Sequence, residues 1–318
     1  MTAETERRPK QVNKSLLTVL IAFLANLLIA IAKSVAAAIT SSASMLAEAA
    51  HSWADAGNEI FLLIADRRSD RGPDSGHPMG HGREAYVWSM FAAFGLFTAG
   101  AVVSIWHGVH QLIAPEEATN YLVAYIVLAI AFVLEGISFI QAMIQSRRLA
   151  ATQDRSVPSY VANTSNPTLR AVVAEDAAAL IGITIAVTGI ALHQVTGSVV
   201  PDAIGSILVG VLLAIVAVFL IDRNRRFLVG EAVRPEVRQQ VLRELLARQD
   251  IDRITYLHLE FVGPGRLYLV ASVDMTGDDV EHDVAVRLRH VERELEEQEY
   301  IEEAVLTLAT PDEVSLTP

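Results

Sequence analysis

The sequence predicts a membrane protein with six transmembrane helices, followed by a C-terminal cytoplasmic α+β domain. Of its 318 residues, 52% are hydrophobic, and the mean hydropathy of +0.37 is high for an ordinary soluble domain of this length. Several apolar runs approach or exceed the roughly 20 residues with which a helix spans a bilayer. Residues 231–318 hold 20 acidic residues against 9 arginines, so almost all of the net charge of −12 follows the apolar part. Two domains in different surroundings explain this division.

Six apolar segments can each cross a membrane once, and Gly and Ser residues that allow close helix packing interrupt most of them. The predicted spans are 15–39, 44–65, 86–113, 121–144, 169–193 and 201–221. The polar start predicts a cytoplasmic tail over residues 1–14. The first span is too long for a signal-peptide core, so we expect it to be retained. These spans define a transmembrane domain over residues 15–228.

Among the segments that flank and connect the spans, only alternate ones carry Lys or Arg. They precede the first span, lie between the second and third, and follow the fourth and sixth: Arg7, Arg8, Lys10, Lys14, Arg67, Arg68, Arg71, Arg83, Arg147, Arg148, Arg155, Arg223, Arg225 and Arg226. The loops near 40–43, 114–120 and 194–200 have neither Lys nor Arg. The positive-inside rule therefore places both termini in the cytoplasm of a multi-pass membrane protein. The absence of a targeting segment favours a bacterial inner membrane.

Residues 229–318 are predicted to form a separate cytoplasmic domain. Residues 235–249 and 283–298 have the pattern of amphipathic helices, whereas 254–262, 266–275 and 300–309 are predicted strands. The order α-β-β-α-β is typical of a small ferredoxin-like fold. Its acidic surface excludes nucleic acid as a partner and is compatible with cation handling.

The second span carries polar residues at membrane depth, where unpaired charges are costly. His51 and Asp55 are four residues apart and share one helix face. Imidazole nitrogen and carboxylate oxygen suit Zn²⁺ and similar divalent cations, and the chain has no cysteine to supply thiolate ligands. Glu48 lies on the same side, and we expect it outside the ligand set. Lys33 of the first span is expected to extend its ammonium to the membrane surface.

The fifth span supplies adjacent carboxylates at Glu175 and Asp176, which would repel each other without a cation or a proton. One interpretation is a metal site formed by His51, Asp55 and Asp176, completed by Glu175 or water. The other is a set of interhelical hydrogen bonds with one carboxyl protonated. Glu135 in the fourth span is equally compatible with helix packing and with a proton relay.

The loop between the second and third spans contains Asp74, His77 and His81. Three ligand-type side chains within eight residues can reach one cation. A Gly- and Pro-rich loop can also carry histidines as solvated turn residues, and the sequence leaves both interpretations open.

Three motifs resemble the cation diffusion facilitator family of divalent-metal/proton antiporters. They are S-x-S-M-L-A-E-A-x-H-S-x-x-D over 42–55, H-P-M-G-H-G-R-E over 77–84, and PDAIGSILVG over 201–210. The resemblance covers nearly the whole chain and implies six spans, cytoplasmic termini and a cytoplasmic α-β-β-α-β domain.

The resemblance also implies roles for individual residues. The family takes two transport ligands on the second span, matched by His51 and Asp55, and two on the fifth, of which Asp176 matches the second. The first falls at Val172, which cannot ligate a metal, and Glu175 is the candidate substitute.

Other positions match features of the family outside that site. Asp74, His77 and His81 match a secondary loop site, and Arg83 and Glu231 match a charge pair between the third and sixth spans. The resemblance further implies a homodimer formed through the cytoplasmic domain and the membrane helices. The terminal strand lacks the ligands of the family's binuclear cytoplasmic site.

The predicted function is therefore Zn²⁺ efflux from the cytoplasm in exchange for protons, by alternating access, with Fe²⁺, Co²⁺, Mn²⁺ and Cd²⁺ as other possible cargoes. The chain is not expected to be an enzyme. One rival is an intramembrane metalloenzyme that activates water; against it, the chain has no H-E-x-x-H pair. The other is a transport-inactive metal sensor or scaffold subunit, which the absence of a ligand at Val172 would explain.

Overall fold

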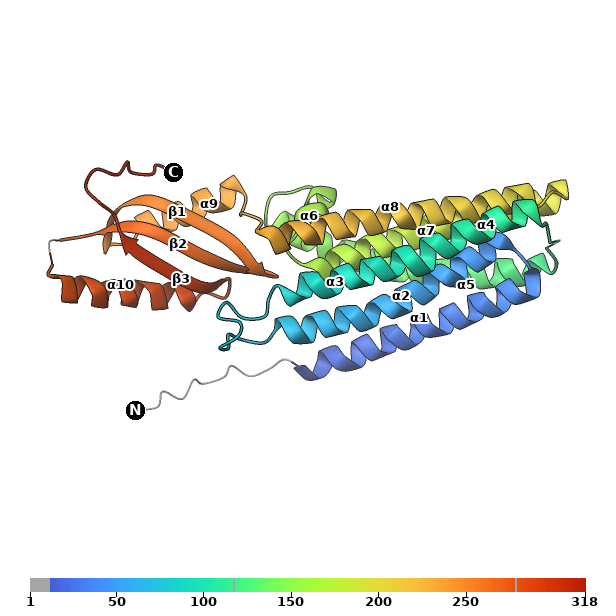
Figure 1. Cartoon of the computed structure of the whole chain (residues 1–318), viewed down its shortest axis with the longest axis horizontal. Coiled ribbons are helices and arrows are strands. Elements are labelled where there is room, and N and C mark those ends of the chain that lie inside the picture. The colour runs from blue at the N-terminus through green and yellow to red at the C-terminus, as the bar shows by residue number, and fades with distance from the viewer. Residues whose placement is uncertain (1–11, 117, 278) are drawn as a thin grey trace. The chain divides into compact units, whose positions relative to one another are not determined.

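A computed structural model describes residues 12–116, 118–277 and 279–318 (Figure 1). The chain divides into two compact units. The helical unit comprises Met1–Leu63, Phe91–Val157 and Ala171–Leu220. The mixed unit comprises Ile64–Met90, Pro158–Arg170 and Ile221–Pro318. Each unit is described by itself below.

The described part of the chain is helical up to residue 229. The elements are α1 (Val12–Thr40), α2 (Ala43–Ser69), α3 (Glu84–Gly95), the π-helical stretch η1 (Leu96–Val102), α4 (Val103–Ile113), α5 (Tyr121–Ala151), α6 (Val157–Asn163), α7 (Pro167–Thr196) and α8 (Val200–Val229) (Figure 1). The third predicted span is thus one continuous run of α3, η1 and α4. The short helix α6 was not predicted.

Five segments in the described residues are long and apolar enough to cross a membrane: Phe23–Thr40, Glu84–Ile113, Tyr121–Ala151, Pro167–Thr196 and Val200–Val229. The predicted second span corresponds to α2, which has 27 residues and is long enough. It is less apolar than the others because it carries the polar residues discussed below. The predicted helical membrane domain is confirmed. The predicted tail over 1–14 falls mostly on residues 1–11, outside the described residues, together with Arg7, Arg8 and Lys10.

Small residues allow the helices of the helical unit to pack closely. Its buried clusters are rich in alanine, including Ala36, Ala124 and Ala186. At Gly108 of α4, an added Cβ would lie 2.7 Å from the carbonyl oxygen of Ala203 in α8. Because a side chain there would collide with backbone, glycine is required for this approach of α4 to α8.

The N-terminus of α2 is held by a carboxylate from α8. Asp202 is fully buried, and its side chain accepts hydrogen bonds from the backbone N–H of Ala43 (2.7 Å), the backbone N–H of Ser44 (3.2 Å) and the hydroxyl of Ser42 (2.9 Å). A carboxylate at a helix N-terminus satisfies N–H groups that lack intrahelical partners and interacts favourably with the helix dipole. The preceding Ser41 has a left-handed φ of 52°. This contact fixes the start of the helix that carries His51 and Asp55.

The C-terminal part of the mixed unit confirms the predicted α-β-β-α-β order. Its elements are α9 (Pro235–Leu246), β1 (Ile251–Gly263), β2 (Arg266–Met275), α10 (Glu281–Glu296) and β3 (Ile301–Leu308). Strand β2 is central, antiparallel to β1 and parallel to β3. Alternate residues of β2 are buried and pack with Leu245 of α9 and Leu295 of α10. One face of the sheet therefore forms the hydrophobic core of this domain.

Candidate metal-binding sites

The face of α2 at membrane depth carries buried groups with free ligand atoms. The Nε2 atom of His51 lies 3.5 Å from Oδ2 of Asp55, a distance that the i, i+4 spacing on one helix face allows. His51 is fully buried, and within the described residues neither of its ring nitrogens has a hydrogen-bond partner. Oδ1 of Asp55 is also buried without a partner there. Unpaired buried polar atoms are costly, and a bound cation would satisfy these.

The two adjacent carboxylates of α7 turn toward different helices. Oε1 of Glu175 accepts a hydrogen bond from Nδ2 of Asn58 in α2 (2.9 Å). Oδ2 of Asp176 accepts one from the hydroxyl of Ser138 in α5 (2.7 Å). Successive residues of a helix point about 100° apart, which explains the divergence. Glu175 is therefore the carboxylate directed at the helix of His51 and Asp55.

The loop after α2 brings its three predicted ligands together. Ligand atoms of Asp74, His77 and His81 all lie within 4.8 Å of one another, the only set of three or more His, Asp and Glu residues in the described residues to do so. Oδ2 of Asp74 is 2.9 Å from Nε2 of His81, and its Oδ1 is 3.3 Å from Nδ1 of His77. Two imidazoles and a carboxylate are a suitable donor set for Zn²⁺.

Hydrogen bonds within the loop set its electrostatics. The bond to His81 is the main reason why the pKa of the Asp74 carboxyl is lowered. The same bond, with a second to Glu84, raises the pKa of His81. The Nδ1 atom of His81 lies 3.1 Å from Oε1 of Glu84, so that the carboxylate orients the ring that a metal would bind.

Comparison with known proteins agrees with these features. Residues 19–229 match the cation efflux transmembrane domain family. The chain belongs to the cation efflux, or cation diffusion facilitator, family. It is 35% identical over 241 residues to metal tolerance protein C4 of Arabidopsis thaliana, which covers 76% of this chain and 53% of that protein.

Two further relatives differ in how much of their own length the chain covers. The mitochondrial proton-coupled zinc antiporter SLC30A9 of Homo sapiens is 34% identical over 238 residues, or 75% of this chain and 42% of the antiporter. An uncharacterized transporter of Methanocaldococcus jannaschii is 22% identical over 303 residues, or 93% of this chain and 97% of that protein. The chain thus spans about half the length of the plant and human relatives. The family is one of transporters and not of enzymes.

The expected transport site of this cation efflux protein is not gathered into one compact set. His51 and Asp55 are neighbours, Glu175 reaches α2 through Asn58, and Asp176 is bonded to α5. The four-residue ligand set stays a prediction. Sequence analysis did not identify Ser138 as a partner, because a lone serine in an apolar span carries no distinctive pattern.

Two expected side-chain arrangements are wrong. Arg83 pairs with Glu260 of β1, not with Glu231. Glu231 uses its backbone carbonyl to accept a hydrogen bond from the N–H of Phe261 (3.2 Å). Lys33 does not extend to the membrane surface: it is fully buried, and its Nζ lies 2.8 Å from Oε2 of Glu48. Pairing satisfies this ammonium inside the bundle, so it has no need of solvent.

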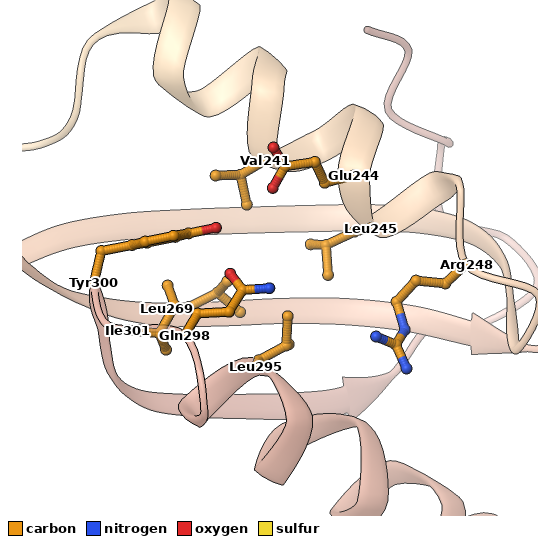
Figure 2. Close-up of a pocket in the computed structure, with 9 residues that line it drawn as sticks. All are labelled: Val241, Glu244, Leu245, Arg248, Leu269, Leu295, Gln298, Tyr300 and Ile301. Atoms are coloured by element: carbon orange, nitrogen blue, oxygen red, sulfur yellow. The ribbon is translucent and has the colours of Figure 1, made fainter. Parts of the chain in front are cut away.

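The small C-terminal domain has a pocket lined by Leu245 of α9, Leu269 of β2 and Leu295 of α10, among other residues (Figure 2). Its volume is about 50 Å³, which suits one or two water molecules. Arg248 at its rim is already paired with Asp250 and Glu294. Glu244 also lines the pocket and accepts a hydrogen bond from Nε2 of Gln240 (2.9 Å). The small volume excludes a ligand much larger than water.

Proposed function

We propose that the chain exports divalent cations, chiefly Zn²⁺, from the cytoplasm in exchange for protons. The observation that carries the proposal is the His51–Asp55 pair, in which His51 is fully buried and both side chains have free ligand atoms, in a membrane protein of the cation efflux family. A relative named as a proton-coupled zinc antiporter supports the choice of metal and counter-ion. One imidazole among carboxylates favours Zn²⁺ over Mn²⁺.

In the proposed site, His51 and Asp55 bind the cation together with Glu175 and Asp176. Glu175 would leave Asn58 and Asp176 would leave Ser138, so these two partners hold the carboxylates in place when no cation is bound. Metal binding requires deprotonated ligands and therefore releases protons. If the site faces each side of the membrane in turn, metal moves one way and protons the other.

The remaining predictions complete the proposal. Residues 15–228 form the transport domain, and residues 229–318 form a cytoplasmic domain through which, together with membrane helices, two copies associate. The protein lies in a bacterial inner membrane, with both termini in the cytoplasm. Asp74, His77 and His81 hold a second cation at the cytoplasmic surface; their short mutual distances support this role.

The test is zinc uptake into liposomes that contain a zinc-sensitive dye and carry a pH gradient, repeated with Fe²⁺, Co²⁺, Mn²⁺ and Cd²⁺. Asp55→Ala and Asp176→Ala should abolish zinc flux. Glu175→Gln should reduce it if Glu175 replaces the ligand absent at Val172. Glu116→Ala is the matched control, since it removes an exposed acidic side chain and should leave flux unchanged.

Zinc flux at the normal rate in both aspartate variants would refute the site. Zinc binding by the purified chain without flux would instead favour the sensor or scaffold interpretation. Flux that does not respond to the pH gradient would refute proton exchange while leaving cation transport in place.

A further inference from the structure

The ion pair between Lys33 of α1 and Glu48 of α2 lies inside the helical unit. Both side chains are fully buried, and Nζ lies 2.8 Å from Oε2. A buried ion pair is often no more stabilising than apolar residues of similar volume, and charges at membrane depth are retained mainly for function. Stability alone is therefore a weak reason for this pair.

The Glu48 carboxylate has one oxygen to spare. Its Oε1 is buried and has no hydrogen-bond partner within the described residues. It points at Gly182 of α7, where an added Cβ would lie only 2.6 Å away. Glycine at position 182 is therefore required for this placement of the unsatisfied carboxylate oxygen, because a side chain there would collide with it.

Glu48 continues the ligand face of α2. It precedes His51 by three residues and Ser52 by four, so the three share one turn. His51 and Ser52 are also buried, with both ring nitrogens and the hydroxyl lacking hydrogen-bond partners in the described part of the chain. The positive charge that Glu48 binds in this structure is therefore the ammonium of Lys33, which is part of the chain, and Glu48 itself is close in sequence to the proposed transport ligands.

We propose that Glu48 is a second, transient cation-binding carboxylate beside His51, and that Lys33 is a tethered competitor that prevents a divalent cation from remaining there. This inference rests on the proposed function. Glu48 lies three residues before His51, which is about 4.5 Å along the helix axis. A divalent cation that leaves His51 and Asp55 toward the N-terminal end of α2 therefore meets Glu48 next. With Lys33 present, the cation cannot displace the ammonium for long and is released. Without Lys33, Glu48 and His51 retain it.

The two members of the pair should therefore change zinc affinity in opposite directions. Zinc affinity would be measured by competition with a fluorescent chelator, using the full chain in phospholipid nanodiscs. All variants would carry Asp74→Ala and His81→Ala to remove the loop ligands. Lys33→Met should tighten zinc binding about tenfold or more, the scale of one charged contact. Glu48→Gln should weaken it by a similar factor, because it leaves the ammonium unpaired near His51.

Three further variants serve as controls. Lys33→Arg keeps the charge and should bind zinc as the parent does. The double variant Lys33→Met/Glu48→Gln should have a zinc affinity within about threefold of the parent, because it lacks both the Glu48 carboxylate and the competing ammonium of Lys33. Adding Gly182→Ala to Lys33→Met should reverse the tightening, since the new methyl group would lie 2.6 Å from Oε1 and displace the Glu48 carboxylate from its place beside His51.

A purely structural pair would give a different result. Both single variants would then lower the yield of folded protein and shift zinc affinity in the same direction or not at all, and that outcome overturns the proposal. Lys33→Gln provides a second neutral variant; if neither neutral variant folds, the pair serves assembly alone and the proposal is wrong. Because binding is measured without flux, a chain that fails to transport zinc but shows the opposite shifts refutes the proposed function and not this inference.

Discussion

Replacing Asp202 tests how the start of the ligand-bearing helix is fixed. The carboxylate accepts three hydrogen bonds, from the backbone of Ala43 and Ser44 and from the hydroxyl of Ser42. Asp202→Ala leaves these three donors without their acceptor in a buried place. Each unsatisfied buried donor costs about 1–3 kcal/mol. The variant no longer buries a carboxylate, and the desolvation cost that it avoids offsets part of this sum.

The expected net loss is about 2–4 kcal/mol of unfolding free energy, at or above the upper end of the range for helix N-caps. Asp202→Asn should lose about half as much, because its amide oxygen still accepts one or two of the bonds. The measurement is reversible unfolding of the full chain in mixed micelles, followed by helical circular dichroism. Amide hydrogen exchange at Ala43 and Ser44 should also accelerate.

Asp222→Ala is the matched control. Asp222 lies on the same helix, but it is partly exposed and pairs with nearby Arg225 and Arg226. Such surface pairs contribute about 0–1 kcal/mol. The reasoning is refuted if Asp202→Ala unfolds like the control, or if exchange at Ala43 and Ser44 is unchanged.

Two other predictions concern packing and the loop. Gly108→Ala should destabilise the fold by about 1–3 kcal/mol, because its methyl group would overlap the backbone of Ala203, whereas Gly136→Ala meets no atom within 4 Å and should be neutral or slightly stabilising in the same unfolding assay. Zinc binding by the loop should weaken as pH falls, because protons compete with the metal for the imidazoles. The hydrogen bond to Asp74 raises the pKa of His81. The weakening should therefore begin at a higher pH than for a free imidazole, whose pKa is about 6.5. Asp74→Asn should shift that dependence to lower pH in zinc titrations of the chain, and an unchanged midpoint would contradict the assignment.

Much of the architecture depends on short stretches of sequence and is predictable from them. Apolar length determines the helices, and alternation determines the strands of the C-terminal domain. The spacing of His51 and Asp55 places them on one helix face whatever surrounds them, and the observed 3.5 Å contact follows from that spacing. The loop set of Asp74, His77 and His81 is similarly local, since its members are separated by at most seven residues.

Contacts between distant elements could not be predicted in this way. Glu175 and Asp176 are neighbours in sequence, yet one bonds to α2 and the other to α5. Arg83 pairs with β1 and not with Glu231. A transmembrane helix has apolar side chains on most of its faces, so its sequence does not reveal the rotation about its axis that brings one face against a given neighbour.

The sequence by itself determined where the long apolar helices lie and which residues can offer ligand atoms to a cation, because each property depends on composition or spacing within one segment. Only the tertiary structure decided that Lys33 binds Glu48, that the other carboxylate oxygen of Glu48 lies against Gly182, and that Asp202 holds the start of α2. The physical reason is that these contacts require two or three helices to meet at one depth and one rotation. Packing sets that geometry, and no single segment encodes it.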